Sequence, residues 1–197
     1  MKESEPSQQP HPFVCIEGID GVGKSTVSRK LAAALGGAYY KTPPPPYDAI
    51  RADIDMRAAP CARLYFYLSA VFFASGEIDA LRRVQPVVCD RYIYSTLAYH
   101  VTMDECFRGH MLPADLLMPD VTFLLVAGEA ERLRRLVDRG ELVSKHDSTL
   151  EANREYLAAV QREFSAFNLE VIDTTETSED EIVSLILARM PIKEAVS

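Results

Sequence analysis

Two short stretches of the chain combine the residue types that bind and transfer phosphate. The first, GIDGVGKS, runs from Gly18 to Ser25, matches G-x-x-x-x-G-K-[ST], and lies between an apolar run and a helical pattern. In that context successive backbone N–H groups point at one phosphate, helped by the helix N-terminus. Lys24 is then expected to reach the β- and γ-phosphates, and Ser25 to ligate Mg²⁺. The residues expected to contact the nucleotide are Gly18, Ile19, Asp20, Gly21, Val22, Gly23, Lys24, Ser25 and Thr26.

The second stretch, PVVCDRYIYSTLAYH, covers residues 86–100. Its apolar run ends in an adjacent acid and base, Asp90 and Arg91, at the end of a predicted strand beside the phosphate loop. A carboxylate there is expected to hold the Mg²⁺ shell or to orient the acceptor, which makes Ser25 and Asp90 the predicted metal ligands. The guanidinium is expected to bind a phosphate through two parallel hydrogen bonds.

The elements that position these stretches follow from the hydrophobic pattern. Short runs that are apolar on both faces alternate with helical patterns, which is typical of a parallel sheet covered by helices on both sides. Ligands of such sheets bind at the carboxyl ends of the strands. The runs are residues 13–17, 38–41, 86–90, 121–127 and 169–174, and the helical patterns are residues 27–36, 47–56, 61–83, 95–107, 129–140, 150–167 and 178–190.

Other local signals complete the predicted organisation. The proline run 42–46 predicts a stiff loop, because proline fits neither a helix interior nor a central strand. Ser178 and Glu181 have capping-box spacing at the start of the last helix. We expect residues 1–11 to be a disordered tail and residues 12–192 to form a single domain.

Composition narrows the class of protein. The 197 residues carry a net charge of −8 with no basic face or stripe, which argues against a nucleic-acid-binding protein. No apolar run reaches the ~20 residues of a membrane span, and the polar N-terminus lacks the centre of a signal peptide. The four cysteines are widely spaced, which predicts buried, reduced thiols. These features predict a soluble, cytoplasmic protein without a nucleic-acid or membrane partner.

The two stretches together resemble the thymidylate kinase family of nucleoside-monophosphate kinases. The resemblance rests on FVCIEGIDGVGKSTVSRKLAAAL and VVCDRYIYSTLAYH, and extends more weakly over residues 13–190. It implies a three-layer α/β/α P-loop kinase fold with about five parallel strands and a small lid at about residues 135–150. It also implies ATP- and Mg²⁺-dependent phosphoryl transfer to a (deoxy)nucleoside 5′-monophosphate, with dTMP to dTDP as the first expectation, and a homodimer.

The resemblance also implies roles for individual residues. Asp20 matches an acid that contacts the acceptor sugar or phosphate, and Arg91 matches the arginine on the acceptor phosphate. Ser95 and Tyr99 match residues that line the nucleotide pocket, where the tyrosine ring disfavours a ribose 2′-hydroxyl. Gly21 stands where some members carry an arginine.

Members with that glycine usually supply the cation from the lid. The candidate cations here are Arg135, Arg139 and Lys145, whose charge offsets that of the transferred phosphoryl group. The expected catalytic residues are Lys24, Asp90, Arg91, Arg135 and Arg139.

Three departures from the family pattern concern the acceptor site. KTPPPPYDAIR replaces an R-E-P-G-like sequence, although Lys41 and Arg51 keep positive charge there. The stretch LYFYLSA puts Phe66 at a base-stacking position but Ala70 where the family has a base-reading arginine, and His100 stands where glutamine is common. The sequence therefore leaves open which nucleobase the acceptor carries. The expected acceptor-binding residues are Asp20, Lys41, Arg51, Phe66, Arg91, Ser95 and Tyr99.

Two further readings stay open at this point. In the first reading, the protein is a kinase whose acceptor is a hydroxyl group, as in nucleoside kinases or other small-molecule kinases. Asp90 or Glu17 would then act as the base that removes the hydroxyl proton. The second is a nucleotide-binding switch without kinase activity. A modified nucleotide as acceptor also fits the departures. Convergence of Lys41, Arg51 and Arg91 on a second anion site would favour a monophosphate, because a hydroxyl does not need that much positive charge.

Overall fold

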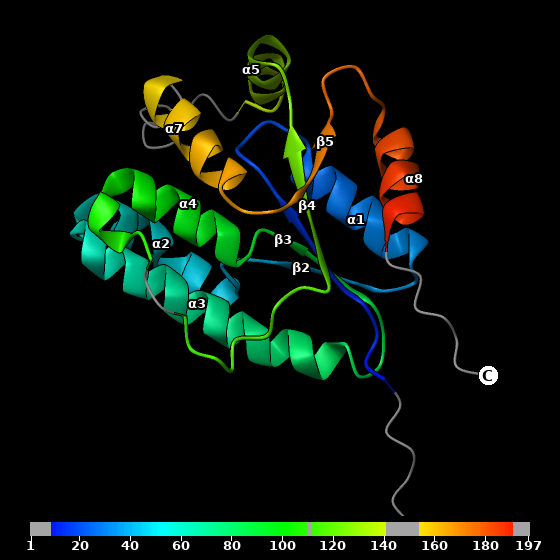
Figure 1. Ribbon diagram of the computed structural model, residues 1–197, viewed down its shortest axis with the longest axis horizontal. Helices are drawn as coiled ribbons and strands as arrows, with labels where there is room; N and C mark the ends of the chain where they lie inside the picture. The colour runs from blue at the N-terminus through cyan, green and yellow to red at the C-terminus, as the bar shows by residue number, and fades with distance from the viewer. Residues whose placement is uncertain (1–8, 110–111, 141–153, 191–197) are drawn as a thin grey trace, which may run out of the picture.

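The computed structural model describes residues 9–109, 112–140 and 154–190. Most of the expected tail and most of the expected lid, with Lys145, lie outside these residues. One sheet of five parallel strands has the order β2-β3-β1-β4-β5 (Figure 1). The strands are β1 Phe13–Glu17, β2 Ala38–Lys41, β3 Val87–Asp90, β4 Val121–Val126 and β5 Glu170–Asp173.

Helices cover both faces of this sheet. Helices α1 and α8 lie together on one face, whereas α3 and α4 lie on the other face with α2 and α7 beside them (Figure 1). The predicted three-layer α/β/α fold is therefore confirmed. The helices are α1 Lys24–Ala34, α2 Pro45–Arg57, α3 Pro60–Leu81, α4 Ile93–Met103, α5 Glu129–Asp138, α7 Arg154–Ser165 and α8 Glu179–Arg189, with a short 3₁₀ turn at Glu105–Phe107.

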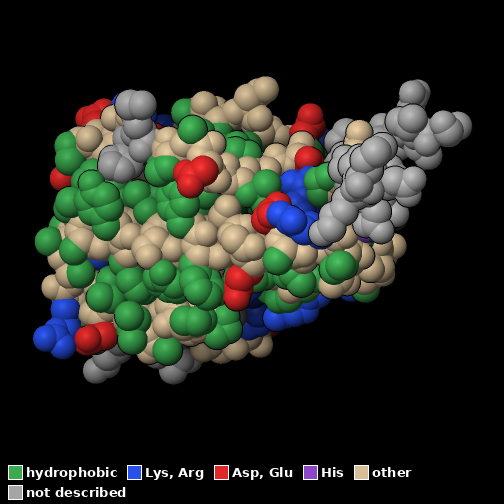
Figure 2. Space-filling view, turned by 90° about the horizontal axis from the view of Figure 1, so that it is seen from below, with side chains coloured by type: hydrophobic (Ala, Val, Ile, Leu, Met, Phe, Trp, Pro, Cys, Tyr) green, Lys and Arg blue, Asp and Glu red, His purple; other side chains and the backbone are tan. Residues whose placement is uncertain are grey.

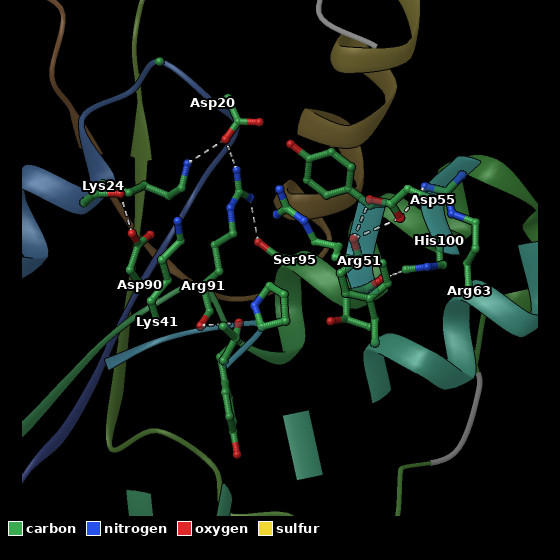
Figure 3. A pocket seen from close by; sticks show the side chains of 18 of the residues that line it. Asp20, Lys24, Lys41, Arg51, Asp55, Arg63, Asp90, Arg91, Ser95 and His100 are labelled. Atoms are coloured by element: carbon green, nitrogen blue, oxygen red, sulfur yellow. Dashed lines mark hydrogen bonds and ion pairs between the residues drawn. The ribbon is translucent and has the colours of Figure 1, made fainter. Parts of the chain in front are cut away.

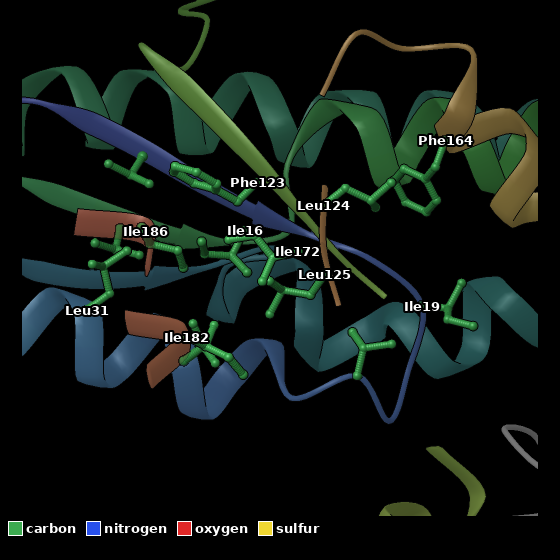
Figure 4. Packing of buried hydrophobic residues seen from close by; sticks show 14 of the residues in the cluster. Ile16, Ile19, Leu31, Phe123, Leu124, Leu125, Phe164, Ile172, Ile182 and Ile186 are labelled. Carbon is green, nitrogen blue, oxygen red and sulfur yellow. The ribbon is translucent and has the colours of Figure 1, made fainter. Parts of the chain in front are cut away.

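The strands are apolar along their length because alternate side chains enter different clusters. Ile16 and Phe123 pack with Leu31 of α1 and Ile186 of α8 (Figure 4). Phe13 and Cys15, which point the other way along β1, belong to the cluster of α3. Because the strands are buried on both faces, their sequences form continuous apolar runs and do not alternate between apolar and polar residues.

The loop that contains the proline run is shorter than predicted. Helix α2 begins at Pro45, with Pro44 as its N-cap, so the expected loop 42–46 overlaps the first helical turn. Proline is accepted there because the first N–H groups of a helix have no intrahelical partner. The capping box is confirmed, since Ser178 accepts from Glu181 N at 3.3 Å and donates its own N–H to Glu181 Oε2 at 2.9 Å.

The cysteines divide into two groups, both free. Cys15 and Cys89 are buried in β1 and β3, as predicted, whereas Cys61 and Cys106 are exposed. The expectation of burial was therefore wrong for the second pair, which lies outside the strands.

Within the described residues, one helix is long and apolar enough to cross a membrane by length and composition alone. This helix is α3. Its Leu64, Val71 and Ile78 are buried against the sheet cluster that contains Phe13. Core helices of soluble proteins pass the same test, and 39% of the apolar stretch of α3 is buried.

Candidate active site

The loop between β1 and α1 buries its apolar side chains, whereas Asp20 is exposed. Ile19 and Val22 are buried in the core cluster, and Val22 O accepts a hydrogen bond from Thr174 Oγ1 at 2.9 Å. Gly21 has φ of 87°, and a Cβ there would lie 2.4 Å from Arg132 Cγ and 2.8 Å from Arg132 O. Helix α5 therefore packs directly on the loop at a position where only glycine fits.

Lys24 is held at the centre of this loop. Its side chain is 6% exposed, and Nζ donates to Ile19 O at 2.7 Å and lies 3.6 Å from Asp20 Oδ1 (Figure 3). Burial, together with the charge of Arg91, lowers the pKa of Lys24 to about 8. The Asp20 carboxylate contacts both the Lys24 ammonium and the Arg91 guanidinium, so it offsets their mutual repulsion.

Ser25 and Asp90 form the contact that the sequence suggested between the two stretches. Ser25 Oγ donates to Asp90 Oδ2 at 2.5 Å, and the Tyr39 hydroxyl donates to the same oxygen at 3.2 Å. Asp90 is 1% exposed, and its Oδ1 has no hydrogen-bond partner among the described residues. A buried carboxylate oxygen without a donor, next to a hydroxyl, fits a hard divalent cation such as Mg²⁺.

The described residues contain no group of three or more His, Cys, Asp or Glu side chains placed to hold a metal.

Arg91 is fixed by the turn that follows β3. The residue has φ of 67°, a left-handed conformation that is uncommon outside glycine. Its Nη1 donates to Gly18 O at 2.9 Å and to Ser95 Oγ at 3.1 Å, and its Nη2 donates to the Asp20 carboxylate (Figure 3). The guanidinium therefore lies between the phosphate loop and the start of α4.

A fully buried carboxylate, Glu17, secures that turn. Glu17 accepts hydrogen bonds from Tyr92 N at 2.9 Å, Ser95 N at 3.1 Å and Ser95 Oγ at 2.5 Å. Burial raises the pKa of Glu17, against the opposing effects of the Ser95 hydrogen bonds and the charge of Arg91. Because Glu17 ends β1 and Ser95 lies in the first turn of α4, this contact ties the two functional stretches together.

Both stretches open onto one cavity of about 330 Å³. Lys41 enters it from the end of β2, Arg51 from α2, and Arg91 from the turn after β3 (Figure 3). Lys24 lines the same cavity. Further lining residues are Asp20, Gly21, Gly23, Ser25, Thr42, Pro43, Asp55, Arg63, Tyr67, Asp90, Tyr92, Ser95, Thr96, Tyr99, His100, Met103, Leu136 and Arg139.

One end of the cavity carries a polar cluster from three helices. Asp55 of α2 accepts from Tyr67 Oη at 2.9 and 3.0 Å and from Arg63 Nη2 at 3.2 Å. The rings of Tyr67 and His100 lie 5.3 Å apart between centroids. Sequence reasoning selected only His100 of these four as a site residue, as a departure from the family pattern. The i, i+4 spacing of Arg63 and Tyr67 puts both on one face of α3, but no local signal connects them with Asp55 of α2.

Comparison with known proteins agrees with this geometry. Residues 16–186 match the family model for thymidylate kinase. The chain belongs to the thymidylate kinase family. Members of this family are nucleoside-monophosphate kinases, so the protein is an enzyme that transfers a phosphoryl group from ATP to a nucleoside monophosphate.

Individual members of the thymidylate kinase family match nearly end to end. A probable thymidylate kinase of Methanocaldococcus jannaschii is 29% identical over 183 residues, which cover 89% of this chain and 93% of that protein. The thymidylate kinase of Neorickettsia sennetsu is 30% identical over 208 residues, covering 94% and 98%. The solved thymidylate kinase of Candida albicans has a TM-score of 0.72 at 19% identity, covering 91% of this chain and 90% of that one, and supports the fold.

The aromatic side chain that faces the cavity from α3 is not the one that the resemblance selected. Among the described residues the cavity is lined by Tyr67 and not by Phe66, whose ring packs against Tyr47 at 5.5 Å and edge-on against Tyr67 at 5.3 Å. Ala70, at the family's base-reading position, is 1% exposed and does not line the cavity. The inner end of the cavity is therefore built from residues other than these two.

The two expected lid cations within the described residues occupy different places. Arg139 lines the cavity, and its Nε donates to Arg135 O at 3.2 Å. Arg135 is not among the described residues that line the cavity; it donates to Thr174 O at 2.6 Å and to Glu131 Oε1 at 2.7 Å. Of these two, Arg139 is therefore the cation that this conformation brings to the cavity.

The position of another arginine, Arg132 of α5, was not foreseen. Arg132 is 3% exposed and its Nη1 donates to Asp20 O at 3.3 Å, beside Gly21. Its spacing from Arg135 and Arg139 gave no reason to select it, since all three belong to one basic helix pattern. Only the packing of α5 on the loop distinguishes it.

Proposed function

We propose that this protein transfers the γ-phosphoryl group of ATP to the 5′-phosphate of a deoxynucleoside monophosphate, with dTMP as the preferred acceptor. The observation that carries the proposal is the presence of two groups of cations in one cavity. Lys24 belongs to the donor loop, whereas Lys41, Arg51 and Arg91 line the remaining part. Two anionic groups brought together for reaction need this amount of neutralising charge.

In the proposed reaction an oxygen of the acceptor phosphate attacks the γ-phosphorus, and the bond between that phosphorus and the β–γ bridging oxygen breaks. ADP leaves with the electron pair of that bond, and the acceptor becomes a diphosphate. No general base is required, because the attacking phosphate oxygen carries no proton that must be removed at neutral pH. Catalysis then consists of positioning and charge neutralisation.

Each site residue has a role in this scheme. The backbone of Gly18 to Thr26, with the ammonium of Lys24, holds the ATP phosphates. Arg91, Arg51 and Lys41 hold the acceptor phosphate. Asp20 orients the Arg91 guanidinium through their ion pair, and it lies close enough to the cavity to contact the acceptor. Arg139, with any cation from the expected lid, offsets charge on the transferred group.

Mg²⁺ is the proposed metal, held by Ser25 and Asp90. When bound, it neutralises charge on the β- and γ-phosphates and fixes their orientation. The oxygen of Asp90 that has no donor supports this assignment. Tyr39, which donates to the other oxygen, keeps the carboxylate oriented.

Ser95 and Tyr99 line the same cavity as Arg91. The Arg91 guanidinium lies 5.6 Å from the centroid of the Tyr99 ring, so the ring supports the cation that binds phosphate. We infer that the same ring stands against the sugar and disfavours a 2′-hydroxyl.

A homodimer through α3 is part of the proposal. Apolar side chains gather over much of the face seen in Figure 2. Tyr65 and Phe73 of α3 are 56% and 43% exposed, and Ile50 and Met56 of α2 are also exposed. Exposed aromatic side chains on one face favour protein–protein contact.

We further infer one domain over residues 12–192, a location in the cytoplasm, and no nucleic-acid or membrane partner. The net charge of −8 supports the absence of a nucleic-acid partner. The continuous packing between β1 and all neighbouring layers supports a single domain.

The test is ADP release from ATP–Mg²⁺ with a panel of acceptors, comprising the common ribo- and deoxyribonucleoside monophosphates and the matching nucleosides. A response led by dTMP is expected. A response to nucleosides only would overturn the proposal, and Arg91 would then be assigned to binding ATP instead of the acceptor. ATP binding without turnover on any acceptor would favour the switch reading.

A further inference from the structure

The inner end of the cavity contains two buried polar atoms without a partner. His100 is 2% exposed, and its Nε2 has no hydrogen-bond partner among the described residues. The same holds for Nε of Arg63. Both residues line the cavity, from α4 and α3 respectively (Figure 3). Buried polar atoms are paired in most native structures, so two unpaired ones in a ligand cavity point to a ligand that pairs them.

The hydrogen-bonding roles of these two atoms are fixed by their surroundings. His100 Nδ1 lies 2.7 Å from Thr96 O, and a carbonyl oxygen only accepts, so Nδ1 carries the proton. Burial lowers the pKa of His100, which keeps the ring neutral at pH 7. Nε2 is then an acceptor. Nε of Arg63 is always a donor, because a guanidinium keeps its protons.

Asp55 is already engaged and does not present a free carboxylate to a base. It accepts from both Arg63 and Tyr67, as described above, and the pair Arg63–Asp55 is largely buried, with side-chain exposures of 18% and 19%. This contact also orients Arg63. Its Nη2 is held by Asp55, while its Nε remains without a hydrogen-bond partner among the described residues. The cluster therefore offers one oriented donor and one oriented acceptor.

We propose that Arg63 and His100 read the base of the acceptor nucleotide, with Arg63 Nε donating to a ring carbonyl and His100 Nε2 accepting from the adjacent ring N–H. An oxo-pyrimidine, thymine or uracil, presents a carbonyl next to N3–H. In cytosine N3 is an acceptor, which opposes the His100 lone pair. Tyr67, whose ring lies beside His100, supplies an aromatic surface for the base.

This inference rests on the proposed function and replaces one part of the family pattern. Ala70 is buried outside the cavity lining, so the cation that meets the base comes from Arg63 instead, two helical turns earlier on α3. The specificity of this enzyme is then set by a pair of side chains on two different helices.

The test compares dTMP, N3-methyl-dTMP and dCMP as acceptors at saturating ATP–Mg²⁺, with His100→Leu, His100→Gln and Arg63→Gln. Arg57→Gln is the matched control, since Arg57 is exposed on α2 and pairs only with Asp53 in the described contacts. Wild-type enzyme is expected to favour dTMP over the other two by about 10- to 100-fold in kcat/KM, the range of one buried hydrogen bond.

His100→Leu is expected to abolish the discrimination against N3-methyl-dTMP, whereas His100→Gln retains it through the amide oxygen. Arg63→Gln is expected to raise KM for dTMP about 10- to 100-fold with a smaller change in kcat. The glutamine variant of His100 also shows whether a loss in the leucine variant reflects folding.

Unchanged discrimination in His100→Leu, or a wild-type preference for dCMP, would overturn the inference while leaving the kinase assignment intact. A wild-type enzyme that neither binds nor phosphorylates any of the three monophosphates would overturn both.

Discussion

The donor and acceptor parts of the cavity are built in different ways. The donor part is one contiguous loop, Gly18 to Ser25, whose backbone we propose to hold the ATP phosphates. Its side chains Ile19 and Val22 are buried in the core. The acceptor part is assembled from side chains on β2, α2, α3 and α4, far apart in sequence. A backbone site tolerates little change, whereas a side-chain site changes its ligand by exchanging single residues. The departures from the family pattern accordingly lie in the acceptor part.

The strongest test of the donor part is Lys24→Ala. We expect kcat to fall by about 10³-fold or more with every acceptor, because the ammonium stabilises charge that develops on the transferred group. Lys30→Ala is the control, as Lys30 lies on the same helix but pairs with Glu179 and Asp180 at the surface. The measurement is ADP release. Activity near wild type in Lys24→Ala would remove the loop from the mechanism.

Arg91→Ala tests the acceptor part. We expect kcat/KM for the monophosphate to fall by about 10²-fold, the cost of a charge-assisted contact to phosphate, while KM for ATP changes little. Initial rates at varied acceptor and fixed ATP separate the two constants. Arg83→Ala, an exposed arginine on the loop after α3, serves as control. An effect on KM for ATP alone would assign Arg91 to the donor and erase the distinction between the two parts.

Gly21→Ala tests how rigid the donor loop is. We expect a loss of about 2–4 kcal/mol in the free energy of unfolding, from the positive φ and from contact of Cβ with the Arg132 backbone oxygen. Gly76→Ala is the same substitution in α3, where a Cβ meets nothing within 4 Å, and it should stabilise by about 0.5–1 kcal/mol. Chemical denaturation measures both. Equal effects at the two sites would mean that α5 does not constrain the loop.

The pH dependence sharpens the same comparison with a smaller effect. Lys24 is charged below its pKa of about 8, so kcat/KM for ATP should decline above pH 8, by up to about 10-fold per pH unit. Bound ATP phosphates raise that pKa, so kcat should decline at higher pH than kcat/KM does. Rates at saturating and limiting ATP between pH 6.5 and 9.5 give both profiles. Coincident profiles would contradict the assignment of Lys24 to ATP.

Much of the donor part was predictable from sequence because its signals are local. The phosphate loop, the strands before it and after it, and the contact of Ser25 with Asp90 follow from spacing and from the rule that parallel strands end at one edge. The same rule placed Lys41 and Arg91 in one cavity.

The acceptor part was predictable except at its inner end. The expected residues that line the cavity are Lys41, Arg51, Arg91, Ser95 and Tyr99. The alignment of LYFYLSA selected Phe66 and Ala70, whereas Tyr67 and Arg63 line the cavity. A shift of one residue on a helix turns the side chain by about 100°, so a weak resemblance does not fix which residue faces the ligand.

The sequence by itself determined the α/β class, the phosphate loop and the charged pair after β3, since each depends on residues close together in the chain. Only the tertiary structure decided that α5 brings Arg132 against Gly21, and that α2, α3 and α4 bring Asp55, Arg63 and His100 to one end of the cavity. The physical reason is that helix packing depends on the shapes of many side chains at once. No short stretch of sequence contains that information.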